Sequence, residues 1–208
     1  MTREQYIEQC LRQIYGGYIP QDSSITFNLV NQYLNQAIGV AAKQCYKESM
    51  QLEAVGYVNN SFYTTFKGLA VTKDENFLWK VTLPQIPIGI GYNEGISTMV
   101  FKDSTGQASM PVVWLSENQK SFINNMRQVP NKLLGYYEGQ YAYVLSTIIL
   151  SAYTVNVTMI SGGDNTDLSS TLNLPDDYFP IVTEYIKAQL GFEKAQVQDT
   201  TNDGSENK

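Results

Sequence analysis

The side chains that could do chemistry in this sequence are carboxylates, because none of the 208 residues is a histidine. Histidine is the usual general base and the commonest metal ligand, and its absence removes the ordinary means of activating a serine or cysteine nucleophile. Two carboxylates are nevertheless enough for a glycosidase. Four places in the sequence offer candidates: Asp74 with Glu75, Glu94, Glu138, and Asp176 with Asp177.

Local backbone roles account for both adjacent pairs of carboxylates. Asp74 and Glu75 belong to a turn signal, Lys-Asp-Glu-Asn, between two stretches of strand-forming residues. Asp176 and Asp177 precede an apolar helical pattern, where negative side chains suit the positive end of a helix. We therefore predict no catalytic residue, and a carboxylate-only glycosidase stands third among three functional hypotheses.

The sequence also predicts no metal site and no cofactor site. An EF-hand register that begins at Asp164 would place Thr166 and Leu168 at ligand positions, and a leucine cannot bind calcium. Cys10 and Cys45 lack the close spacing of zinc ligands, and we expect both to be unpaired core residues of a protein made in a reducing cytoplasm. Neither a phosphate-binding Gly-x-x-x-x-Gly-Lys loop nor a Gly-x-Ser-x-Gly nucleophile motif occurs.

Composition favours contacts with other proteins over contacts with nucleic acid. The net charge is −6 and no run of Lys or Arg occurs, whereas non-specific binding to DNA needs a basic surface. Only 16% of the residues are charged, against about 25% in a typical protein, and the centres of protein interfaces are depleted in charge. We expect no export signal and no membrane segment, since serines and threonines interrupt the apolar stretch at residues 144–155.

Tyrosines are concentrated in one predicted strand. The aromatic residues there and nearby in sequence are Tyr136, Tyr137, Tyr141, Tyr143, Trp114 and Phe122. Together they could form a sugar-binding platform, which makes a carbohydrate-binding or receptor-binding tail module with Tyr-rich strands the second hypothesis. Tyrosine also fills cores and subunit contacts well, and the sequence favours that interpretation here.

Helical patterns occur at both ends of the chain. Thr2 and Gln5 fit a capping box at the start of the first helix, and a Gly-Gly pair at residues 16–17 suits its end. Ser24 is the predicted N-cap of a longer helix that runs to about Leu52. A last helix is predicted after Asp176 and Asp177, with Pro180 in its first turn.

The middle of the chain is rich in Val, Ile, Thr and aromatic residues and predicts β-strands. The predicted strands are residues 61–71, 76–83, 96–102, 110–115, 136–145 and 153–160. Between them, residues 117–127 predict a short helix. Residues 83–87 predict an extended arm or a crossover connection, because they contain two prolines and proline donates no ladder hydrogen bond.

These elements predict an α+β protein in which a small helical bundle, formed by the N- and C-terminal helices, carries a large antiparallel β-rich insertion. The expected parts are an N-terminal helical part at residues 1–56, the insertion at 57–160, a loop and closing helix at 161–196, and a disordered acidic tail at 197–208.

Several segments, in this order, resemble the adaptor or ring proteins below the portal of tailed bacteriophages, particularly those of crAss-like phages. The segments are YIEQCLRQIYGG at 6–17, LPQIPIG at 83–89, GISTMV at 95–100, YEGQYAYV at 137–144 and LPDDYF at 174–179. The resemblance covers most of the chain and implies a structural protein, since the family has no active-site residues to transfer.

By this resemblance the chain forms a homo-oligomeric ring, commonly of twelve subunits, in the neck or tail of a virion assembled in the bacterial cytoplasm. Its partners would be the portal protein and other neck or tail rings. DNA would pass through the ring without specific binding, which agrees with an acidic chain that lacks basic clusters. A ring subunit that joins capsid to tail is therefore the first hypothesis.

Overall fold

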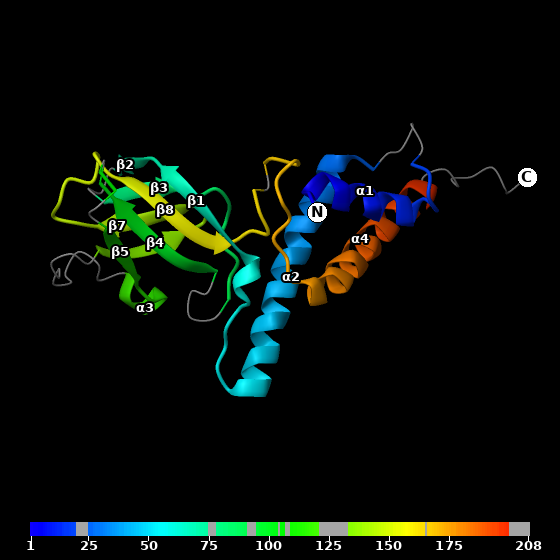
Figure 1. The fold of residues 1–208 in the computed structure, drawn as a ribbon, viewed down its shortest axis with the longest axis horizontal. Coiled ribbons are helices and arrows are strands. Elements are labelled where there is room, and N and C mark those ends of the chain that lie inside the picture. Colours follow the sequence, from blue (N-terminus) through cyan, green and yellow to red (C-terminus); the bar gives the residue numbers. More distant parts are fainter. Residues whose placement is uncertain are drawn as a thin grey trace, which may run out of the picture. The chain divides into compact units, whose positions relative to one another are not determined.

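A computed structural model describes residues 1–19, 25–74, 78–90, 95–103, 105–106, 109–120, 133–164 and 166–199. The protein is a mixed α+β structure with a large sheet and with helices at both ends (Figure 1), which confirms the predicted class. The chain divides into two compact units. The helical unit comprises residues 1–62 and 161–208, and the sheet unit comprises residues 63–160.

The helical unit is built from segments at both ends of the chain. Its helices are α1 (Arg3–Ile14), α2 (Phe27–Glu53) and α4 (Phe179–Asp199), with 3₁₀ turns η1 (Asn60–Phe62) and η4 (Asp176–Tyr178). Helix α4 therefore includes residues 197–199, which were predicted to be part of a disordered tail. Residues 200–208 lie outside the described part of the chain.

Side chains cap both N-terminal helices. The capping box of Thr2 and Gln5 is present at the start of α1, as predicted. Helix α2 begins two residues later than the sequence suggested, because the N-cap is Thr26, whose hydroxyl accepts a hydrogen bond from the backbone N–H of Leu29 at 3.2 Å. Ser24, the predicted cap, lies outside the described residues.

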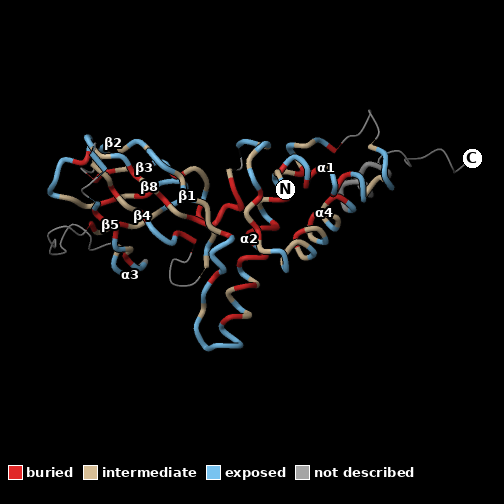
Figure 2. Tube along the Cα trace, in the orientation of Figure 1, coloured by how far each residue is buried: buried red, intermediate tan, exposed pale blue. Residues whose placement is uncertain are grey.

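Helix α2 packs against both α1 and α4. Buried residues recur along α2 at helical spacing, and Figure 2 shows buried segments repeating along the length of the helix. They are Val30, Leu34, Ala37, Ile38, Gly39, Ala41, Ala42, Cys45 and Ser49. The apolar stripes of the other two helices face them, with Ile7 and Leu11 from α1 and Val182, Ile186 and Leu190 from α4 all buried. None of these helices could bury its stripe alone.

The first residues of the chain are held by the segment that leads to α4. The backbone N–H groups of Arg3 and Glu4 donate to the carbonyls of Ser170 and Leu168, at 3.0 and 2.9 Å. These donors belong to the first turn of α1 and have no partner within the helix. Carbonyl groups far away in sequence thus accept the hydrogen bonds of the free backbone N–H groups at the N-terminus of α1.

A charged side chain is buried in the helical unit. The guanidinium of Arg3 donates to the carbonyl of Gly162 at 3.2 Å, to the amide oxygen of Asn31 at 2.9 Å and to that of Asn35. Burial lowers the pKa of Arg3 to about 10, while the carboxylate of Asp164 favours the charged form. Arg3 therefore ties α1 and α2 to the segment that follows the sheet unit.

The sheet unit contains one eight-stranded sheet. Its strands are β1 (Tyr63–Leu69), β2 (Val71–Lys73), β3 (Trp79–Thr82), β4 (Ile96–Lys102), β5 (Ser109–Trp114), β6 (Leu133–Glu138), β7 (Tyr141–Leu145) and β8 (Thr154–Ile160). They pair in the order β1-β8-β4-β5-β6-β7-β3-β2. Since a single residue, Ala70, separates β1 from β2, the two ends of this order lie close together and the sheet is nearly closed.

Two details of the sheet differ from the sequence prediction. Strands β5 and β6 pair in parallel, so the sheet is not purely antiparallel, and the connection between them includes the short helix α3 (Glu117–Lys120). Residues 136–145, predicted as one strand, form parts of β6 and β7. A two-residue loop joins these strands, and its first residue, Gly139, has a φ of 57°, which glycine adopts without strain.

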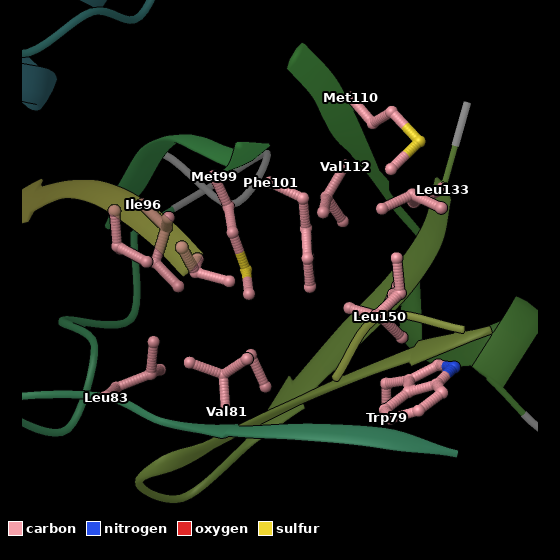
Figure 3. Close-up of a cluster of buried hydrophobic side chains, with 14 of the residues drawn as sticks. Trp79, Val81, Leu83, Ile96, Met99, Phe101, Met110, Val112, Leu133 and Leu150 are labelled. Atoms are coloured by element: carbon pink, nitrogen blue, oxygen red, sulfur yellow. The ribbon is translucent and has the colours of Figure 1, made fainter. Parts of the chain in front are cut away.

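Among the described residues of the sheet unit, an apolar cluster fills the interior (Figure 3). Alternate residues of β8, Val155, Val157 and Met159, belong to it, as the two-residue period of a strand with one covered face requires. Phe101 from β4 and Leu150 from the segment before β8 are also completely buried there. The sheet unit therefore has its own core.

Candidate functional site

The candidate carboxylates occupy separate places in the structure. Asp74 follows β2, and Glu138, at the end of β6, pairs with Lys120 at 3.0 Å. Asp176 and Asp177 form part of η4 in the helical unit. Glu75 and Glu94 lie outside the described residues.

The segment that begins at Asp164, for which the sequence predicted no calcium site, forms turns at Asp164 and Asp167. The carboxylate of Asp164 accepts hydrogen bonds from the backbone N–H and the hydroxyl of Thr166 at 2.9 and 2.7 Å, and these bonds lower its pKa. Asp167 accepts two similar bonds from Ser169. Across the described residues, no three carboxylate, cysteine or histidine side chains gather as metal ligands.

Both cysteines are buried and unpaired. Burial raises the pKa of the Cys10 thiol to about 11, so the thiol is protonated at neutral pH. This places Cys10 among the small core side chains of the helical unit.

The outer surface of the sheet carries a cluster of tyrosines and lysines, here called the tyrosine face. It consists of Tyr136, Tyr141, Tyr143, Lys80 and Lys120. Strand pairing brings it together, because Tyr143 of β7 lies opposite Tyr136 of β6 on one side and Lys80 of β3 on the other.

The rings of the tyrosine face contact one another and the two ammonium groups. Tyr136 and Tyr143 stack with their centroids 5.2 Å apart, and Lys80 Nζ lies 3.8 Å from the centre of the Tyr141 ring. Lys120 Nζ lies 5.1 Å from the centre of the Tyr136 ring. Partial burial raises the pKa of Tyr136, which keeps its phenol protonated at neutral pH. The arrangement is an ordered aromatic surface with a cation at each end.

The predicted aromatic platform is split between the two surfaces of the sheet. Tyr137 and Trp114 meet edge to face, with centroids 5.6 Å apart, and both pack against the interior cluster. They support the core instead of joining the tyrosine face. Phe122 lies outside the described residues. Lys80, which sequence reasoning missed, joins the face through the pairing of β3 with β7, and no local pattern signals it.

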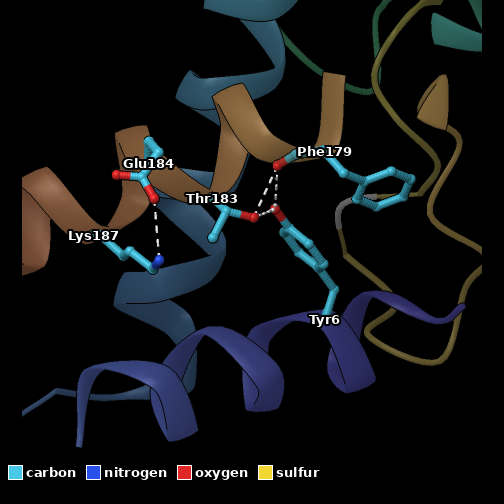
Figure 4. Close-up of polar contacts among 5 residues, drawn as sticks. All are labelled: Tyr6, Phe179, Thr183, Glu184 and Lys187. Atoms are coloured by element: carbon cyan, nitrogen blue, oxygen red, sulfur yellow. Dashed lines mark hydrogen bonds and ion pairs between the residues drawn. The ribbon is translucent and has the colours of Figure 1, made fainter. Parts of the chain in front are cut away.

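In the helical unit, a polar contact joins α1 to α4 (Figure 4). The phenol of Tyr6 lies 2.7 Å from the hydroxyl of Thr183, which donates to the carbonyl of Phe179 at 2.8 Å. Beside them is a hollow of about 360 Å³, whose lining includes Gln9 and Lys187. Burial raises the pKa of Tyr6, so the phenol stays protonated and serves to join the helices.

No protein-family model matches the chain, and no curated protein does. Among the described residues, no helix combines the length and the apolar character needed to cross a membrane.

Exposed apolar side chains gather on α2 and just beyond its end. Leu52 is 84% exposed, Met50 is 44% exposed and Val40 is 41% exposed. Val55 and Tyr57 follow and are also exposed. Val40 and Met50 lie on one side of α2 and Leu52 lies on another, so exposed apolar side chains face more than one direction around this helix.

Proposed function

We propose that the protein is a structural ring subunit in the neck or tail of a tailed bacteriophage. The ring lies below the portal, joins the capsid to the tail and surrounds the DNA channel. In this proposal α1, α2 and α4 act as a small helical bundle that forms the body of the ring, and the sheet unit reaches neighbouring components.

The observation that carries the proposal is the division of the chain. Helices from both ends close one unit, and a β-rich unit of comparable size is inserted between them. This is the layout that the resemblance to phage adaptor proteins implies. The exposed apolar side chains on α2 support it, because a subunit of a permanent assembly covers such surfaces with its neighbours.

The negative net charge of the chain supports a channel through which DNA passes without binding to the protein. The net charge is −6, and Lys120 of the tyrosine face forms an ion pair with Glu138. A ring that lets DNA through should not collect phosphate contacts, which give salt-sensitive affinity. We expect no sub-micromolar binding to duplex DNA at physiological salt in a gel-shift assay.

Co-expression with the portal protein encoded in the same genome tests the proposal. Electron microscopy should show a closed ring of this chain on the portal, commonly with twelve subunits. In disrupted virions the chain should fractionate with the neck and tail. Fractionation with another part of the particle, or no association with the portal, would contradict the proposal.

The tyrosine face favours carbohydrate binding as the second candidate function. Aromatic rings presented beside hydrogen-bonding side chains are typical of sugar-binding surfaces, and Tyr141 is exposed. A glycan array with the wild-type chain and a Tyr141→Ala, Tyr143→Ala variant tests it. Binding that the double substitution abolishes would favour a receptor-binding module, whereas an array without signal would remove this candidate.

A further inference from the structure

Two lysines on α2 face away from the core. Lys43 and Lys47 are exposed and lie one helical turn apart. Among the described residues, neither side chain has an ion pair or hydrogen bond. Val40 and Met50, both exposed, fall on the same side of α2 because all four lie within about 80° around a helix of 3.6 residues per turn. We name Val40, Lys43, Lys47 and Met50 the lysine face.

A second surface of the helical unit has the opposite charge. The carboxylates of Asp176 and Asp177 in η4 are exposed and have no partner among the described residues. The next residue, Tyr178, donates a hydrogen bond to the carboxylate of Glu48 on α2 at 2.5 Å. Leu52, one turn beyond Glu48, is almost fully exposed. We name Asp176, Asp177 and Leu52 the aspartate face.

The two faces point in different directions around α2. Glu48 marks the side of the helix that receives η4, and it lies about 100° from Lys47 and about 140° from Lys43 around the helix axis. This angular separation keeps the side chains of Lys43 and Lys47 away from Asp176 and Asp177 of the same chain. A head-to-tail contact between identical subunits requires two such surfaces, different from each other and widely separated in direction.

We propose that the lysine face of one copy docks on the aspartate face of the next copy. The inference rests on the ring function proposed above and identifies the contact that closes the ring. Two ammonium groups of one copy meet two carboxylates of the next copy. A second copy fits better than another protein, because a single chain supplies both the unpaired cations and the unpaired anions.

Charge reversal tests the contact. Variant A carries Lys43→Glu and Lys47→Glu, and variant B carries Asp176→Lys and Asp177→Lys. Each variant alone places like charges opposite each other, and we expect its assembly on the portal to be about a hundredfold weaker than that of the wild type. An equal mixture of A and B should assemble again, because each face then meets its opposite. A chain with all four substitutions should also assemble.

Matched controls separate this contact from a general effect of charge. Lys67→Glu with Lys102→Glu, in the sheet unit, changes the net charge as variant A does and should leave assembly unchanged. Recovery in the mixture requires that both variants fold, so it also excludes misfolding as the cause of their failure. If A and B each assemble as the wild type does, or if the mixture fails while circular dichroism shows both folded, the docking proposal is wrong.

A cross-linking assay distinguishes failure of the contact from failure of the ring function. In a Lys43→Cys, Asp177→Cys chain, mild oxidation should link successive copies into a ladder of oligomers, since the native cysteines are buried. The ladder should be absent when either new cysteine is left out. A ladder from a protein that never joins a portal would support the docking but contradict the neck function. Portal-bound rings that give no ladder would support the function and overturn the docking.

Discussion

The two units of this protein are stabilised in different ways. The helical unit is joined by contacts between residues that are very distant in sequence: Arg3 and Gly162 are 159 residues apart, and Tyr6 and Thr183 are 177 apart. Polar groups make several of these contacts, including a buried guanidinium. The sheet unit is one continuous stretch of chain whose interior cluster is apolar.

This difference shows which interactions select a single packing arrangement in each unit. In the sheet unit, the alternation of apolar residues and the strand register decide which side chains point inward. In the helical unit, apolar stripes alone would let α1 slide or rotate on α2, and the hydrogen bonds of Arg3 to Asn31 and Asn35 select one arrangement. The helical unit should therefore respond strongly to polar substitutions, and the sheet unit to changes of volume.

Removal of α4 should have the largest effect and should affect one unit. A chain that ends after Asn173 loses Val182, Ile186 and Leu190, each of which contributes about 1.5–3 kcal/mol by burial. The combined loss is comparable to the total stability of a small domain, about 5–15 kcal/mol. We expect loss of helical circular dichroism and aggregation, whereas a chain that ends after Gln196 should remain soluble.

Tryptophan fluorescence shows whether the sheet unit survives this truncation. Both tryptophans, Trp79 and Trp114, belong to the sheet unit, so their emission reports that unit alone. We expect a cooperative transition in fluorescence even when the helical signal is lost. Loss of both signals in the chain that ends after Asn173 would mean that the two units do not fold independently.

A cavity in the sheet unit should have the next largest effect. Phe101→Ala removes a completely buried ring and should lower the free energy of unfolding by about 3–5 kcal/mol. The loss should appear in the fluorescence transition and leave the helical transition in place. Val113→Ala, at an exposed position of the same sheet, is the control and should cost little. A shift of the helical transition by the same amount would break the distinction between the units.

Arg3→Met should produce the converse result in the helical unit. The substitution keeps a long side chain but removes the guanidinium donors to the oxygens of Asn31, Asn35 and Gly162, at a cost of about 2–4 kcal/mol. Thermal unfolding followed by circular dichroism should shift, while tryptophan fluorescence should not. Arg12→Met is the matched control, because Arg12 makes an exposed ion pair with Glu8 that contributes less than about 1 kcal/mol. Equal effects of the two substitutions would contradict a special role for Arg3.

The smallest predicted effect depends on pH. The hydrogen bond from Tyr178, with a second from Gln44, lowers the pKa of Glu48 in the folded state. A lowered pKa means that this stability is present above the ordinary value of about 4.3 and is lost as the pH falls through the folded value. Tyr178→Phe should remove about 0.5–1 kcal/mol at neutral pH and flatten this acid dependence.

Tyr185→Phe is the control for the pH effect. Tyr185 donates to the neutral amide of Gln36, so its loss should lower stability without changing the slope of stability against pH. Denaturant titrations between pH 3 and 7 measure both variants. The same acid slope in wild type and Tyr178→Phe would mean that Glu48 does not contribute through Tyr178.

Local patterns in the sequence predicted the helices and strands themselves better than they predicted which strands pair with each other. The capping box of Thr2 and the alternation of β8 depend on near neighbours, and both are present. The parallel pairing of β5 with β6 depends on a connection of many residues and has no local signature. The hairpin at Gly139 was missed because strand-forming tyrosines lie on both sides of it, and the single glycine was the available signal.

Long-range contacts also decide where the buried arginine and the surface clusters lie, and local sequence patterns do not predict them. Arg3, at the first position of an amphipathic helix, would ordinarily be solvated, and its burial depends on a carbonyl 159 residues away. The tyrosine face needed the pairing of three strands, which sequence spacing does not supply. The spacing of Lys43 and Lys47 was visible in the sequence, but the position of the aspartates relative to them required the contact between Tyr178 and Glu48.

The split of the helical unit along the chain sets an order of folding during synthesis on the ribosome. The sheet unit is complete once residue 160 has emerged, whereas α1 and α2 must wait for α4. At about 5–20 residues per second, the interval between residue 62 and residue 190 is roughly 6–25 seconds. During this time the stripe of α2, including Val30 and Leu34, has no cover from α4. A nascent chain paused in this window should bind chaperones through α2, and release should coincide with the appearance of Leu190.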